Sequence, residues 1–221
     1  MFVKKFNINL LQPKYQLQQI DCIDVGRRYK LPDGQMVPSV TTILKPLTAE
    51  FVDKWREDIG VEKARVITSR AGRRGTIVHK LAEQYLTNQP IVYPNQFIRN
   101  GFKQIKQQLD AHVDNIRAIE YPLYSTELQL AGTTDCIAEW ANRLSIIDFK
   151  NARNSREDYT NYQLQVAAYA KMANQMYQLN ITQGVVIIAI DHDLPKTLVF
   201  DVQPFYPQLQ TMIGQFYEKD V

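Results

Sequence analysis

The sequence predicts an α/β fold of the mixed α+β type, in which a central mixed β-sheet is flanked by helices and preceded by an N-terminal helical extension. Residues 49–115 carry apolar side chains at helical spacing, and residues 117–150 are rich in β-forming side chains. A helical stretch at 159–179 then separates them from β-rich segments at 183–191 and 196–203. Helices, a strand meander and a helix between strands are typical of a mixed sheet with helices on its faces.

The N-terminal part is expected to contain a hairpin over residues 22–37, because Pro32-Asp33-Gly34 is a turn sequence between β-forming stretches. Ser39 is placed to cap a short helix from Val40 to Leu47 that ends near Pro46. We expect helices at 49–67 and 73–87, separated by Ser69-Arg70-Ala71-Gly72, and a third amphipathic helix at 96–115.

The second half is expected to start with a strand meander. The predicted strands are 117–125, 133–140 and 143–150, the last two joined by Ala141-Asn142. A helix at 159–179, the β-rich pair at 183–191 and 196–203, and a last helix at 205–218 complete the order.

Length and composition limit the class of protein. A chain of 221 residues, 45% apolar and 22% charged, suits a single domain over residues 1–221. It has no run of about 18 apolar residues that could span a membrane, and its first residues do not resemble a signal or transit peptide, so we expect a cytoplasmic protein. Two isolated cysteines, Cys22 and Cys136, cannot form a zinc or iron–sulfur cage and are expected to be reduced thiols.

Basic residues are concentrated in one segment. The net charge is only +3, but residues 61–80 contain six Lys or Arg and a single acid, Glu62. Such density suits a phosphate backbone, although a solvated helix face would give the same pattern.

The residues most indicative of chemistry lie in the predicted hairpin. Side chains alternate along a strand, so Asp148 and Lys150 share one face while Phe149 points to the other. Asp135 follows Gly132-Thr133-Thr134 on the partner strand, which can bring its carboxylate beside Asp148. Two adjacent carboxylates repel, and a hard cation such as Mg²⁺ relieves the repulsion. Lys150 could position or deprotonate a water, or stabilise charge on phosphorus. The alternative is a surface hairpin with an ordinary salt bridge.

Two helical segments could complete this site. Residues 74–79 are expected to open a helix, with His79 and Glu83 on one face, so that His79 could bind the cation beside an anion-binding helix start. Gln165 and Tyr169 are likewise i, i+4 neighbours that could contact phosphates or bases. The alternatives are a structural histidine and a helix that buries its tyrosines in the core.

Together these segments resemble the RecB-type branch of the PD-(D/E)XK nuclease superfamily. The matching pieces, in family order, are Gly75–His79 with Glu83, Gly132–Asp135, Asp148-Phe149-Lys150 and Gln165–Tyr169. Pro38–Leu44 further resembles the opening signature of the mitochondrial genome maintenance exonuclease group and its phage and bacterial relatives. The resemblance implies a restriction-endonuclease-like core at 73–221 and a DNA-binding extension at 1–72, and a phage or bacterial source would suit it.

The resemblance also implies roles for individual residues. His79, Asp135 and Asp148, with the main-chain carbonyl of Phe149, would bind Mg²⁺ or Mn²⁺, and Lys150 would act on the attacking water. Many relatives carry Glu where Asp148 stands, a change that the superfamily tolerates. Glu120 is a weaker candidate for a second metal. The residues expected to contact substrate are Gln165, Tyr169, Arg70, Arg73, Arg74, Ser39 and Thr41.

The implied function is a metal-dependent DNA exonuclease that prefers single-stranded DNA ends, with the substrate in a basic groove between residues 40–75 and the sheet. An endonuclease or structure-specific nuclease on the same fold is the first alternative. An inactive DNA-binding accessory protein is the second, although none of the expected acids or the lysine is missing.

Overall fold

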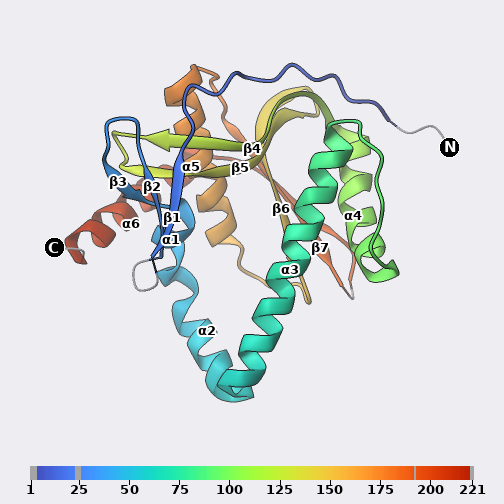
Figure 1. The fold of residues 1–221 in the computed structure, drawn as a ribbon, viewed down its shortest axis with the longest axis horizontal. Helices are drawn as coiled ribbons and strands as arrows, with labels where there is room; N and C mark the ends of the chain where they lie inside the picture. Colours follow the sequence, from blue (N-terminus) through green and yellow to red (C-terminus); the bar gives the residue numbers. More distant parts are fainter. Residues whose placement is uncertain (1–3, 23–25, 192, 220–221) are drawn as a thin grey trace.

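A five-stranded mixed sheet forms the centre of the molecule (Figure 1) in the computed structural model, which describes residues 4–22, 26–191 and 193–219. The strand order is β4 (Val113–Ser125), β5 (Leu130–Trp140), β6 (Arg143–Ala152), β7 (Gln183–Ile190) and β8 (Lys196–Asp201). Only β6 and β7 pair in parallel. The predicted mixed α/β class is therefore confirmed, and β4 begins directly where α4 ends.

Helices cover both faces of this sheet. Helix α5 (Thr160–Tyr177) packs on one face, and α1 (Val40–Leu44) and α6 (Tyr206–Lys219) pack against α5; a 3₁₀ turn, η1 (Gln203–Phe205), precedes α6. Helices α3 (Val61–Leu86) and α4 (Gln96–His112) cover the other face. Each face therefore has its own hydrophobic core. Ile146 lies in the core beneath α5 and its neighbour Ile147 in the core beneath α3 and α4, as strand alternation requires.

A second, small sheet lies against the beginning of β5. Its antiparallel strands are β1 (Gln18–Cys22), β2 (Gly26–Lys30) and β3 (Met36–Pro38). Strands β2 and β3 form the expected hairpin turn, whereas residues 23–25 of the predicted segment lie outside the described part and β1 was not predicted. A bridge between Ser39 and Ala131 joins this sheet to β5, which brings the start of α1 toward the central sheet.

Helices α2 (Pro46–Ile59) and α3 form a V-shaped arm that projects from the rest of the molecule (Figure 1). The break predicted at Ser69–Gly72 is wrong, because α3 is continuous from Val61 to Leu86. The chain turns instead at Gly60, whose φ of +85° favours glycine. Pro46 also begins α2 rather than ending a helix, since its missing N–H costs nothing at a first helical position.

Two further expectations concern the membrane and the thiols. None of the described helices is both long and apolar enough to cross a membrane. Cys136 is a free, buried thiol, while the side chain of Cys22 lies outside the described part of the chain.

Candidate metal and active site

The site begins where β5 and β6 separate. Their backbone ladder is regular up to the pair Cys136–Ile147. Beyond it, the backbone N–H of Phe149 donates to Asp135 Oδ2 at 2.7 Å, so a side-chain carboxylate takes the place of a backbone acceptor. The hydrogen bond fixes the Asp135 carboxylate at the point where the two inner strands separate.

Asp148 and Lys150 lie on the sheet face that α5 covers, because they follow Ile146 at intervals of two residues. Lys150 Nζ is 2.7 Å from Asp148 Oδ2, and Asp148 is only 1% exposed. The expected acid and amine therefore meet as a nearly buried ion pair.

His79 reaches the same point between β5 and β6 from α3, on the opposite face. Its Nδ1 lies 3.4 Å from Asp135 Oδ1 and 3.5 Å from Glu120 Oε1. Its Nε2 lies 3.0 Å from the carbonyl oxygen of Phe149. Residues separated by some seventy positions thus converge, although that carbonyl, predicted as a metal ligand, already has an imidazole partner.

A local irregularity of β4 brings Glu120 into the site. The β4–β5 register shifts between Asp114 and Ala118, and Glu120 has a φ of +45°, in the left-handed region that non-glycine residues seldom adopt. Such irregularities can turn a side chain away from its regular direction near functional sites. Here Glu120, the weaker candidate among the predicted metal ligands, faces His79.

These groups suit a hard divalent cation. Among the described residues, ligand atoms of His79, Glu120 and Asp135 all lie within 4.8 Å of one another. The two carboxylates are donors that Mg²⁺ and Mn²⁺ prefer, and the imidazole adds a nitrogen donor of the kind that transition metals bind. Asp148, expected in this set, instead directs its carboxylate to Lys150 beside the group.

Electrostatics of the site reflect the crowding of charge. Burial and the neighbouring Asp148 raise the pKa of Asp135 to about 7. Burial lowers the pKa of His79, but Glu120, Asp135 and Asp148 outweigh it and raise that pKa to about 9. Burial also disfavours the charged form of Lys150, yet Asp148 and Asp135 hold its pKa above the ordinary value. Without a cation, the site retains protons.

A cavity of about 210 Å³ opens onto this cluster. Gln165 and Tyr169 line it from α5 and hydrogen-bond each other at 3.3 Å. Gly132 allows the contact with α5, since a Cβ there would lie 2.9 Å from Tyr169 Cε1. The remaining lining residues are Arg27, Tyr29, Ser39, Thr41, His79, Glu120, Thr133, Asp135 and Lys150.

Arg27 and Tyr29 are lining residues that the sequence analysis missed. Both belong to β2, which lies far in sequence from Asp135, Asp148 and Lys150 and carries no motif of its own. Ser39 and Thr41 enter the same cavity, where their hydroxyl oxygens lie 2.9 Å apart. These four residues come near Lys150 only because the small sheet packs against the central sheet. Such packing leaves no local pattern in the sequence.

The three arginines predicted to contact phosphate differ from one another. The guanidinium of Arg74 lies 2.6 Å from Asp191 in a largely buried ion pair, so it ties α3 to the end of β7. Arg70 and Arg73 are exposed, but Arg70 lies about 180° around the helix axis from His79, since successive residues turn about 100°. Residues 73–79 also lie inside α3, so the predicted anion-binding helix start at this point is wrong.

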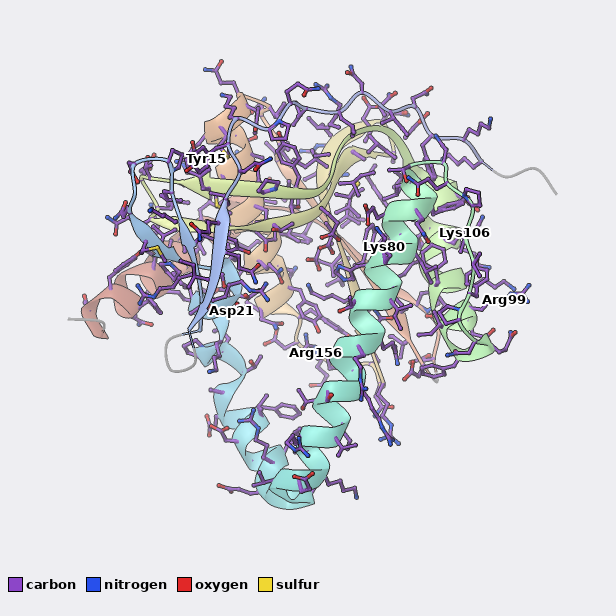
Figure 2. All side chains as sticks on the ribbon, in the orientation of Figure 1. Tyr15, Asp21, Lys80, Arg99, Lys106 and Arg156 are labelled. Atoms are coloured by element: carbon purple, nitrogen blue, oxygen red, sulfur yellow. The ribbon has the colours of Figure 1, made fainter. Side chains whose placement is uncertain are left out.

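A second opening lies along α3. Its cavity of about 460 Å³ is lined by Gly75, Thr76, His79, Lys80, Glu83 and Glu120. Figure 2 labels Lys80 on this part of α3, and its ammonium pairs with Glu83 at 2.8 Å. His79 and Glu120 line both openings, so the acidic cluster is accessible from two sides.

Residues 95–215 match the PD-(D/E)XK nuclease superfamily. Mitochondrial genome maintenance exonuclease 1 from Mus musculus is 26% identical over 174 residues, covering 72% of this chain and 51% of that protein. The Homo sapiens protein of the same name is 23% identical over 182 residues, covering 75% and 53%. The chain thus spans about half the length of the curated relatives it matches.

A solved structure from Eubacterium rectale also aligns, with a TM-score of 0.40 and 11% identity over 67% of this chain and 69% of that chain. This likeness is too weak to bear on fold or function.

Proposed function

Because the chain belongs to the PD-(D/E)XK nuclease superfamily, we propose that it is a metal-dependent deoxyribonuclease that hydrolyses DNA from free ends, with a preference for single strands. The end-directed activity is suggested by the exonucleases it resembles over most of its length. The predicted cytoplasmic location and phage or bacterial source stay predictions, since these relatives are vertebrate proteins with a mitochondrial name.

One observation supports this proposal above the others: His79, Glu120 and Asp135 converge within 4.8 Å beside the Asp148–Lys150 pair. These residues, with Asp148 and the Phe149 carbonyl nearby, would hold Mg²⁺ or Mn²⁺. When bound, the ion would polarise a phosphoryl oxygen and make a water more acidic. Without such an ion, the buried acids would have to share protons with their neighbours.

Lys150 acts in this proposal as a cation. In the metal-free site its carboxylate neighbours hold its pKa above the ordinary value, and its 2.7 Å ion pair with Asp148 favours the ammonium form. An ammonium beside the scissile phosphate would stabilise negative charge that develops during attack. Of the roles left open by the sequence, charge stabilisation is therefore favoured over general base catalysis.

Asp148 positions Lys150, because the ammonium lies 2.9 Å from Oδ1 and 2.7 Å from Oδ2 of its carboxylate. Gln165 and Tyr169 shape the cavity in which the phosphate and its sugar would lie. Their hydrogen bond holds the amide and the phenol in fixed positions, which favours one orientation of the substrate.

The proposal is tested by replacing Lys150 with Met and following the Mg²⁺-dependent release of nucleotides from labelled single-stranded DNA. Lys106→Met is the matched control, since Lys106 forms a similar pair with Asp110 at 2.6 Å on α4, away from the site. We expect the first variant to lose at least about a hundredfold in kcat, the usual scale for a charge-stabilising group. Full activity of Lys150→Met would end the proposal.

The end requirement is tested with a circular single-stranded substrate. The protein should release nucleotides from linear DNA and leave the circle intact. Cleavage of the circle would instead assign an endonuclease to the same site, and binding of DNA without any cleavage would assign an accessory protein.

A further inference from the structure

A cation packed against two neighbouring aromatic rings lies beside the proposed active site. Arg156, in the loop between β6 and α5, has its guanidinium carbon 4.3 Å from the ring centre of Tyr162 and 4.9 Å from that of Tyr159. Its Nη2 donates to Asn161 Oδ1 at 3.1 Å. Arg156 is nevertheless exposed, so its position is fixed while other N–H groups remain available to a ligand.

One of the two rings also contacts the catalytic amine. Lys150 Nζ lies 5.1 Å from the ring centre of Tyr162. Arg156 is therefore separated from the proposed scissile phosphate position by a single side chain. A strand with one phosphate at Lys150 would carry its next nucleotide toward Arg156.

A cavity of about 700 Å³ opens at this cation. Arg156 and Asn161 line it on one side, and Leu47 and Phe51 of α2 line it on the other. Figure 2 shows Arg156 where the space between α2 and α3 meets the body of the molecule. The side chain of Phe51 is 74% exposed. Packing in a core therefore does not explain why an aromatic ring lies across this cavity from Arg156.

Two acids limit what this cavity can bind. Glu157 and Asp158 also line it, so a free phosphate ion meets opposing charge. Asp158 is partly engaged, because its Oδ1 accepts the backbone N–H of Thr160 at 2.7 Å. A ligand that fits must therefore combine a phosphate for Arg156 with an aromatic group for Phe51, as a nucleotide does.

We propose that this cavity is a nucleotide subsite for the strand whose scissile phosphate lies at Lys150. Arg156 contacts the backbone phosphate, and the ring of Phe51 stacks on a base. Stacking on a single ring is tolerant of base identity, so the subsite positions a strand without reading its sequence. This inference rests on the proposed nuclease function and adds the path of the substrate on the α2 side of the site.

Binding tests the subsite without any need for cleavage. The affinity of a fluorescent 20-nucleotide single-stranded DNA is measured by anisotropy in EDTA over a series of salt concentrations. Arg156→Gln should weaken binding about tenfold and reduce the slope of log affinity against log salt by about 0.7, as expected when one phosphate contact is lost from a single strand. Phe51→Ala should weaken binding about tenfold with an unchanged slope.

Two further variants test whether DNA binding depends on the charge in this cavity and whether the loss of affinity is specific to Arg156. Glu157→Gln removes a repelling charge and should tighten binding. Arg99→Gln is the matched control, because Arg99 also faces a ring, 5.8 Å from Tyr93, but belongs to α4 on the outer side of α3 (Figure 2). If Arg156→Gln keeps the affinity and salt slope of the parent protein, or if Arg99→Gln changes them equally, the subsite is wrong.

Cleavage separates this inference from the proposed function. In Mg²⁺, Arg156→Gln should raise KM several-fold and leave kcat within about twofold, since a contact away from the reacting atoms supports binding. A parent protein that binds DNA through Arg156 but never cleaves it would overturn the nuclease proposal and keep the subsite. If the parent protein cleaves DNA and Arg156→Gln has the same KM as the parent, the subsite is wrong and the nuclease proposal stands.

Discussion

Replacing Asp135 with Asn should stabilise the metal-free protein and abolish its activity. The pKa of this buried carboxyl rises from 3.8 to about 7, which corresponds to on the order of 4 kcal/mol against the ionised form. A raised folded-state pKa means that stability is present at low pH and lost as the pH rises through the folded-state value. Above pH 7 the parent protein therefore contains an unfavourable charge that the amide lacks.

The net gain is smaller than this figure, because the substitution also removes a carboxylate that faces His79 and Lys150. We expect a gain of about 2 kcal/mol at pH 8, or roughly 4–8 °C in Tm for a chain of this size. At pH 5, where Asp135 is protonated in the folded parent but already ionised in the unfolded chain, the gain should shrink to less than half of its pH 8 value. Thermal and urea unfolding in EDTA at both pH values measures the difference.

Asp191→Asn is the control of opposite sign. Asp191 is also largely buried, with a side chain 12% exposed, but it is paired with Arg74, so its replacement should lower stability at both pH values. The electrostatic reasoning fails if Asp135→Asn destabilises the protein at pH 8 as Asp191→Asn does. It also fails if the effect of Asp135→Asn is the same at pH 5 and pH 8.

Three other perturbations have defined outcomes. Because His79 holds a proton up to a pKa of about 9, Mn²⁺ affinity measured by calorimetry should rise by up to about tenfold per pH unit between pH 7 and 9, and His79→Ala should flatten that rise. Gly132→Ala places a Cβ 2.9 Å from a ring of α5 and should cost about 1–3 kcal/mol in urea unfolding, whereas Gly75→Ala, in an open helical position, should stabilise by up to about 1 kcal/mol; equal effects would refute the packing argument. Arg74→Ala should lower the unfolding free energy by about 3 kcal/mol through its lost ion pair, and Arg73→Ala should leave it within about 0.5 kcal/mol.

The strands of the central sheet could be predicted because their signal is local. Residues 143–150 alternate between two buried cores, and the Ala141-Asn142 connection adopts positive φ at both residues, as a tight hairpin requires. A shift of the strand pairing by one residue would move every buried side chain to the wrong face. The alternation is therefore strictly kept in the sequence of these strands. The same alternation correctly placed Asp148 and Lys150 on one face.

The break between α2 and α3 could not be located from the sequence. Ser69–Gly72 contains two weak helix formers, yet a glycine inside a long helix costs only about 1 kcal/mol and the helix continues through it. Gly60 carries the actual turn, between Ile59 and Val61, where the neighbouring residues give no turn signal. Because the helix start was misplaced, the anion site inferred at residues 73–79 was misplaced with it.

The types of the site residues could be predicted, but not their arrangement. A divalent ion and a phosphate require acids, an imidazole and an amine, so the motifs identify Asp135, Asp148, Lys150 and His79 by chemistry. Which acid faces the imidazole depends on backbone detail: a positive φ turns Glu120 toward His79, while a two-residue spacing directs Asp148 to Lys150. Such detail arises from strand pairing over the whole sheet, and no local pattern encodes it. The division into a metal-facing group and a cation-positioning acid is therefore a property of the fold, and Asp135, held by the Phe149 N–H, connects the two.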